Sequence, residues 1–86
     1  MVKIIVIIRD DCIACNVVKK VISQAINNID TEITLNITKN GERHNPKVYP
    51  TTIFEKNNKE IARLEGSFPI DYLNRVIDKL KLEYNG

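Results

Sequence analysis

The chain has 86 residues, 43% of them hydrophobic, so it can bury one modest core and we expect a single domain over residues 1–86. Its 13 basic and 11 acidic residues are spread along the sequence, which excludes a concentrated positive field and makes nucleic acid an unexpected partner. The apolar run 4–8 is too short for a signal peptide or a membrane span, so we expect no membrane association and a cytoplasmic location.

The first elements expected are a strand and a helix. Residues 2–8 are nearly all apolar and β-branched, which is typical of a central strand covered on both faces. Asp10 and Asp11 then interrupt the run, and they favour the positive end of a following helix or cap its free N–H groups. The next apolar residues recur at helical spacing and predict a broad buried face made of Ile13, Val17, Val21 and Ala25 beside Ala14, Val18, Ile22 and Ile26.

A second strand and a loop follow this helix. Ile33, Leu35 and Ile37 alternate with polar residues within 31–38, which indicates a strand with one wet face. A right-handed crossover places this strand parallel to the first and the helix against the sheet. Residues 39–47 are polar and contain a glycine and a proline, so we expect a loop with at most a short helical turn.

The last third of the chain predicts a hairpin and a helix. Strands are expected over 51–55 and 60–65, and Asn57 and Asn58 between them tolerate the left-handed backbone of a hairpin turn. The two strands are therefore expected to be antiparallel. Pro69 suits a first helical turn. The apolar row of the final helix is Ile70, Leu73, Ile77, Leu80 and Tyr84.

Cys12 and Cys15 form a C-x-x-C pair at the junction of the first strand and the first helix. Unpaired backbone N–H groups and the positive dipole end at a helix start favour the thiolate form of Cys12, the form that attacks disulfides. Cys15 lies one turn further on the same side, close enough to resolve a mixed disulfide. We therefore predict a dithiol redox site with Cys12 as nucleophile and Cys15 as the more buried resolving thiol.

Other interpretations of the two cysteines remain open. Both could be small buried hydrophobic residues, because free cysteine is often buried. They could also form half of a zinc or iron–sulfur site; His44 is the only further soft ligand, so a metal would require a second chain, as in a bridged homodimer. A third possibility is an interaction domain without redox chemistry. We expect His44 itself to be solvated.

With this motif, the segment Val48-Tyr49-Pro50-Thr51-Thr52-Ile53 resembles the thioredoxin/glutaredoxin superfamily, and the resemblance covers nearly the whole chain. It implies a thioredoxin-like α/β fold, in a minimal β-α-β-β-β-α form with a four-stranded mixed sheet and helices on both faces. It also implies a cis peptide bond between Tyr49 and Pro50. The backbone of Tyr49 would then bind an extended substrate chain, for which Gly66 leaves room. Tyr49, Pro50 and Gly66 are therefore candidate substrate-binding residues.

The chain departs from both branches of that superfamily. Asp11 replaces the tryptophan that thioredoxins usually carry before the first cysteine, and Val6 replaces their buried, proton-accepting aspartate. Asp10 stands where glutathione-binding members commonly carry a lysine, so it would repel an anionic tripeptide. Both Asp10 and Asp11 oppose a nearby thiolate, and we expect them to raise the pKa of Cys12.

These features favour a monomeric reductase of protein disulfides that uses no cofactor and no metal. Its electrons would come from a thioredoxin-reductase-type or glutathione-linked reductant. The alternatives are a metal-binding or cluster-bridged homodimeric module that uses the same cysteines, and a glutathione-linked glutaredoxin.

Overall fold

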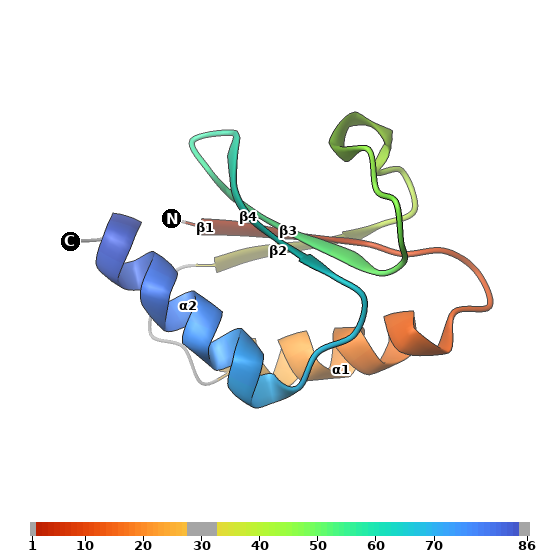
Figure 1. Cartoon of the computed structure of the whole chain (residues 1–86), viewed down its shortest axis with the longest axis horizontal. Helices are drawn as coiled ribbons and strands as arrows, with labels where there is room; N and C mark the ends of the chain where they lie inside the picture. The colour runs from red at the N-terminus through yellow and green to blue at the C-terminus, as the bar shows by residue number, and fades with distance from the viewer. Residues whose placement is uncertain (1, 28–32, 85–86) are drawn as a thin grey trace.

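A computed structural model describes residues 2–27 and 33–84 of the chain (Figure 1). The predicted start of the second strand, residues 31 and 32, and the side chain of Tyr84 lie outside the described part. The elements follow the predicted order, and they are β1 (Val2–Ile7), α1 (Ile13–Asn27), β2 (Ile33–Thr38), the short 3-10 helix η1 (Glu42–His44), β3 (Thr51–Lys56), β4 (Lys59–Glu65) and α2 (Ile70–Tyr84).

The four strands form one mixed sheet in the order β2-β1-β3-β4. β1 pairs in parallel with β2 and antiparallel with β3, where Ile7 lies opposite Thr51. β3 and β4 form an antiparallel hairpin, and its turn residues Asn57 and Asn58 have φ values of 55° and 64°. The central position of β1, the parallel crossover and the left-handed asparagine turn are therefore confirmed.

Both α-helices cover the same face of the sheet, which we call the helix face (Figure 1). They bury one large apolar cluster there, made of Val2, Ile4, Val6, Val18, Ile22, Ala25, Phe54, Leu64, Phe68, Leu73, Ile77 and Leu80. The expectation of helices on both faces is therefore wrong. Residues 39–50 are too polar to present an apolar helical stripe, so they form only the single turn of η1. Neither α-helix of the described residues is long and apolar enough to cross a membrane.

The opposite face, the loop face, has a much smaller apolar patch. Ile5, Ile7 and Ile53 are buried there. The segment that contains η1 lies over this face (Figure 1). Gly41 packs so closely on Ile7 that a Cβ atom at this position would lie 2.5 Å from the Ile7 Cγ2 atom. The absence of a side chain at Gly41 is thus what lets the segment approach the sheet.

The buried side of α1 is narrower than the sequence predicted. Cys15, Val18, Ile22 and Ala25 are buried, whereas Ile13 is 82% and Val17 46% exposed. The apolar residues extend around more of the helix than the sheet can cover. The expectation that Ile13 and Val17 belong to the buried face is therefore wrong, and Ile13 is left exposed beside the first cysteine.

Candidate redox site

Cys12 and Cys15 are joined by a disulfide at the start of α1. Their Cα atoms are 5.2 Å apart, within the range that a disulfide requires. Cys12 lies in the loop just before the helix and is half-buried, whereas Cys15 is only 2% exposed. The two sulfurs thus differ in access, and a large molecule would reach Cys12 first.

The sulfur of Cys12 also caps the helix. The backbone N–H of Cys15 donates a hydrogen bond to Cys12 Sγ at 3.1 Å, and the N–H of Asn16 donates to the Cys12 carbonyl at 3.3 Å. Sulfur here occupies the place of the side-chain oxygen in an ordinary N-cap. Asp11, with a left-handed φ of 55°, turns the chain into the helix but does not cap it. The N–H of Cys15 would stabilise negative charge on Cys12 after reduction of the disulfide.

The Tyr49-Pro50 peptide bond is cis, as the superfamily resemblance implied. Because Ile7 pairs with Thr51, Pro50 lies at the end of β1 from which the cysteine loop departs. In the same loop, the Arg9 guanidinium lies 5.6 Å from the centre of the Tyr49 ring. Two segments forty residues apart in sequence thus meet at the end of β1, where the loop to the cysteines begins.

Gly66 completes this arrangement from β4. Its N–H donates to the Pro50 carbonyl at 2.8 Å. Its φ is +80°, a conformation that favours glycine, and a Cβ atom at this position would meet no atom within 4 Å. Gly66 therefore faces open space. Tyr49 is 36% exposed, and its backbone has no hydrogen-bond partner among the described residues. We call Tyr49, Pro50 and Gly66 together the rim.

Two exposed apolar side chains are direct sequence neighbours of site residues, and the sequence analysis predicted an exposed position for neither of them. Ile13 follows Cys12 directly and Val48 precedes Tyr49, and they are 82% and 41% exposed. No periodicity marks such residues, because exposure depends on where α1 and the loop sit on the sheet.

The charges near the disulfide are partly paired. Lys39, directly after β2, forms an ion pair with Asp10, and both side chains are largely exposed. Asp11 is exposed as well. The negative charge expected from Asp10 is thus offset by a lysine 29 residues away, a contact that only the parallel pairing of β1 and β2 creates.

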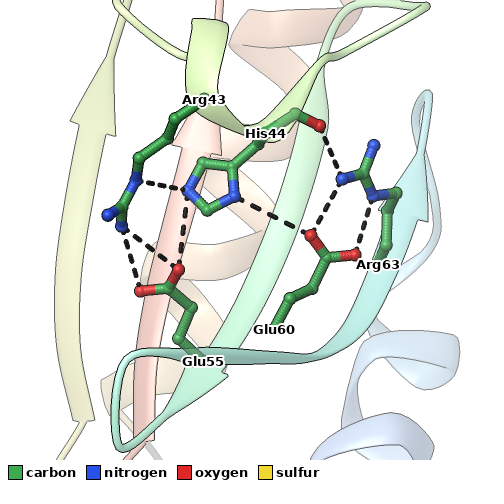
Figure 2. A network of polar contacts seen from close by, with 5 residues as sticks. All are labelled: Arg43, His44, Glu55, Glu60 and Arg63. Carbon is green, nitrogen blue, oxygen red and sulfur yellow. Dashed lines mark hydrogen bonds and ion pairs between the residues drawn. The ribbon is translucent and has the colours of Figure 1, made fainter.

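A polar network fixes η1 to the loop face (Figure 2). His44 lies between two carboxylates, with Nε2 3.5 Å from Glu55 Oε2 and Nδ1 3.7 Å from Glu60 Oε1. Arg43 bonds Glu55 at 3.2 Å, and Arg63 donates to both Glu60 and the His44 carbonyl. The His44 side chain is only 9% exposed, so the expectation of a solvated histidine is wrong. No local pattern indicated this burial, because the carboxylates come from another part of the chain.

The network shifts the ionisation of its outer pair. The hydrogen bond from Arg63 lowers the pKa of Glu60 below its ordinary 4.5, against an opposing effect of burial. The same hydrogen bond raises the pKa of Arg63. The ion pairs and hydrogen bonds of the network hold η1 on β3 and β4, and η1 belongs to the segment that leads to Tyr49 and Pro50. Within the described residues, no three histidine, cysteine or acidic side chains gather as a metal site.

No protein-family model and no curated protein sequence matches the chain, but solved structures match its fold. Thioredoxin-2, a component of the malaria parasite protein secretion machinery, superposes with a TM-score of 0.81 at 21% identity, over 92% of this chain and 82% of that one. The Drosophila melanogaster germline-specific thioredoxin Deadhead gives 0.77 at 18% identity, over 92% and 80%. Chloroplastic thioredoxin z gives 0.78 at 13% identity, over 95% and 80%.

This chain has the thioredoxin fold. The thioredoxin-like fold and the minimal β-α-β-β-β-α arrangement expected from the sequence are therefore confirmed. In this chain the cysteine pair lies at the start of α1, and the cis-proline lies directly before β3.

Proposed function

We propose that this thioredoxin-fold chain is a thiol-disulfide oxidoreductase that reduces protein disulfides. The observation that carries the proposal is the Cys12–Cys15 disulfide at the start of α1, with one accessible and one buried sulfur. The N–H of Cys15 next to Cys12 Sγ supports Cys12 as the nucleophile, because it favours the thiolate that attacks.

The proposed cycle starts from the reduced protein. The Cys12 thiolate attacks one sulfur of a substrate disulfide, and the other substrate sulfur leaves as a thiolate. Cys15 then loses its proton and attacks Cys12 Sγ, which releases the second substrate sulfur and forms the intramolecular disulfide. Two electrons have passed to the substrate, and an external dithiol reductase or a glutathione-linked system returns them. The exposed charge of Asp11 beside Cys12 favours a protein dithiol over anionic glutathione as partner.

Tyr49, Pro50 and Gly66 are proposed to bind the substrate chain. The Tyr49 backbone is unpaired within the described residues, so it can pair with an extended peptide in the manner of an added strand. The open space in front of Gly66 leaves room for that peptide. Exposed Ile13 and Val48 would contact its apolar side chains.

Insulin reduction tests the catalytic assignment. With dithiothreitol as the electron donor, the parent protein is expected to accelerate insulin precipitation, and Cys12→Ser to give no more than the uncatalysed rate. Full activity of Cys12→Ser would refute the proposal. Metal analysis and mass measurement on freshly purified protein separate this function from a metal-bridged dimer, which would carry zinc or iron in stoichiometric amount.

Two tyrosines provide a matched test of substrate binding. Tyr49→Ala is expected to raise the KM for insulin several-fold and to leave kcat within twofold, because the exposed ring adjoins the backbone that pairs with the substrate and takes no part in the proposed sulfur exchange. Tyr72→Ala removes a ring of similar exposure, 48%, on α2 beside β4. Equal KM changes in the two variants would contradict the placement of the substrate.

A further inference from the structure

The Thr52 hydroxyl is buried and has no hydrogen-bond partner within the described residues. Its neighbour Thr51 is equally inaccessible, but the Thr51 hydroxyl donates to the Val48 carbonyl at 2.7 Å. A buried hydroxyl without a partner costs free energy, and in folded proteins such groups are rare and are found at redox or catalytic positions, among others. Thr52 is therefore a polar group that the oxidised protein leaves unsatisfied.

The side chain of Thr52 lies on the helix face of the sheet. Thr52 is opposite Val6 on β1 and Leu64 on β4, and both of these belong to the large apolar cluster. Phe54, two residues further along β3, belongs to it as well. Because successive side chains of a strand alternate between faces, Thr51 lies on the other face. The hydroxyl of Thr52 is thus surrounded by apolar groups that offer it no partner.

Cys15 lies at the same end of this helix face. β1 and β2 are parallel, so α1 runs back along β1, and its first turn covers the end of the sheet that holds Val6 and Thr52 (Figure 1). Cys15 is the first member of the buried row that continues with Val18. One end of the helix–sheet interface therefore contains a buried sulfur and a buried, unpartnered hydroxyl.

We propose that the Thr52 hydroxyl donates a hydrogen bond to Cys15 Sγ when the disulfide is open. The inference rests on the proposed function, which frees Cys15 in every cycle. In the disulfide the sulfur is neutral and a weak acceptor, whereas the Cys15 thiolate that forms during resolution is a strong one. The Cys15 proton passes to solvent, the sulfur attacks Cys12 Sγ, and the substrate sulfur leaves with the electron pair. Thr52 keeps its own proton throughout, so it stabilises charge and does not act as a base.

Thr52→Val tests this role because it removes the hydroxyl at nearly constant volume. The bond forms only in the reduced protein, where the freed Cys15 sulfur accepts it as a thiol and more strongly as a thiolate, and the unpaired hydroxyl penalises only the oxidised form. The variant is therefore expected to shift the redox equilibrium with glutathione about tenfold toward the disulfide, which is a potential about 30 mV more negative. The oxidised variant should also melt higher than the oxidised parent, while the reduced one should not.

Thr52→Ser keeps the hydroxyl and is expected to stay within twofold of the parent equilibrium. Thr51→Val, which removes the paired hydroxyl on the other face, should lower the stability of both redox forms alike. The proposal is overturned if Thr52→Val shifts the equilibrium less than twofold, or if Thr52→Ser shifts it as much. Should Thr52→Val not fold, Thr52→Ala and Thr52→Ser differ mainly by the hydroxyl and give the same comparison. If the parent protein reduces insulin but Thr52→Val has the same redox potential as the parent, the role of Thr52 is refuted and the proposed function is not.

Discussion

On the helix face of the sheet, apolar side chains from three strands and both helices form one continuous cluster, whereas the loop face buries only Ile5, Ile7 and Ile53. The cover of the loop face is held instead by the close approach of Gly41 and by ion pairs around His44. In the proposed redox site, the cysteines belong to the start of α1 on the helix face. The cis-proline ends the segment 39–50, which lies over the loop face. Substitutions in the apolar cluster of the helix face should therefore affect mainly stability. Substitutions on the loop face should affect both stability and substrate binding at the rim.

The largest effect is expected on the helix face. Leu73 on α2 is fully buried, and Leu73→Ala should lower the free energy of unfolding by about 2–5 kcal/mol because it leaves a cavity. Leu82→Ala on the same helix removes a side chain that is 82% exposed, and its effect should stay within about 0.5 kcal/mol. Chemical denaturation measures both. The folded fraction of Leu73→Ala should keep the parental KM for insulin. A raised KM would contradict the claim that the helix face affects stability and not substrate binding.

A smaller loss of stability, joined to a loss of function, is expected on the loop face. Gly41→Ala places a Cβ atom 2.5 Å from Ile7 and should cost about 1–3 kcal/mol. Because the segment must move away from the sheet, the KM for insulin should also rise. In an Ile7→Ala background the added methyl group finds room, so the stability cost of Gly41→Ala should largely vanish. An unchanged cost in that background would show that the clash is not its cause.

The smallest effect concerns the pH dependence of the network. The pKa of Glu60 is lower in the folded chain than the ordinary 4.5, so its stabilisation is fully present above that value and is lost as the pH falls through the folded pKa. Its side chain is 36% exposed, so Glu60→Gln should cost less than about 1 kcal/mol at pH 7, and this cost should shrink as the pH falls through the folded pKa. Denaturation curves measured at a series of pH values below 7 test this, and an Arg63→Gln background should abolish most of the difference. A cost that does not shrink as the pH falls would contradict the ionic origin.

The sequence predicted the parts of the fold that local patterns determine. The unbroken apolar run of β1, the helical spacing after Cys12 and the Asn57-Asn58 turn each indicate one conformation. The cysteine pair was predicted for the same reason, because its spacing is local, whereas the cis bond before Pro50 was predicted from the resemblance to the thioredoxin/glutaredoxin superfamily.

Contacts across the chain could not be predicted in this way. The pattern around Ile13 and Val17 indicates a helix but not which side of it meets the sheet. His44 becomes buried only because Glu55 and Glu60 arrive from the hairpin, and Lys39 meets Asp10 only because β2 lies beside β1. The unpaired hydroxyl of Thr52 likewise depends on its apolar cross-strand neighbours Val6 and Leu64.

The central claim, that Cys12 attacks and Cys15 resolves, is tested most directly by trapping the mixed disulfide. Reduced Cys15→Ser protein mixed with oxidised insulin is expected to form a covalent adduct at Cys12, visible by mass spectrometry and removed by dithiothreitol. Reduced Cys12→Ser should form little or none, because Cys15 is only 2% exposed. An equal or larger adduct at Cys15 would contradict the account.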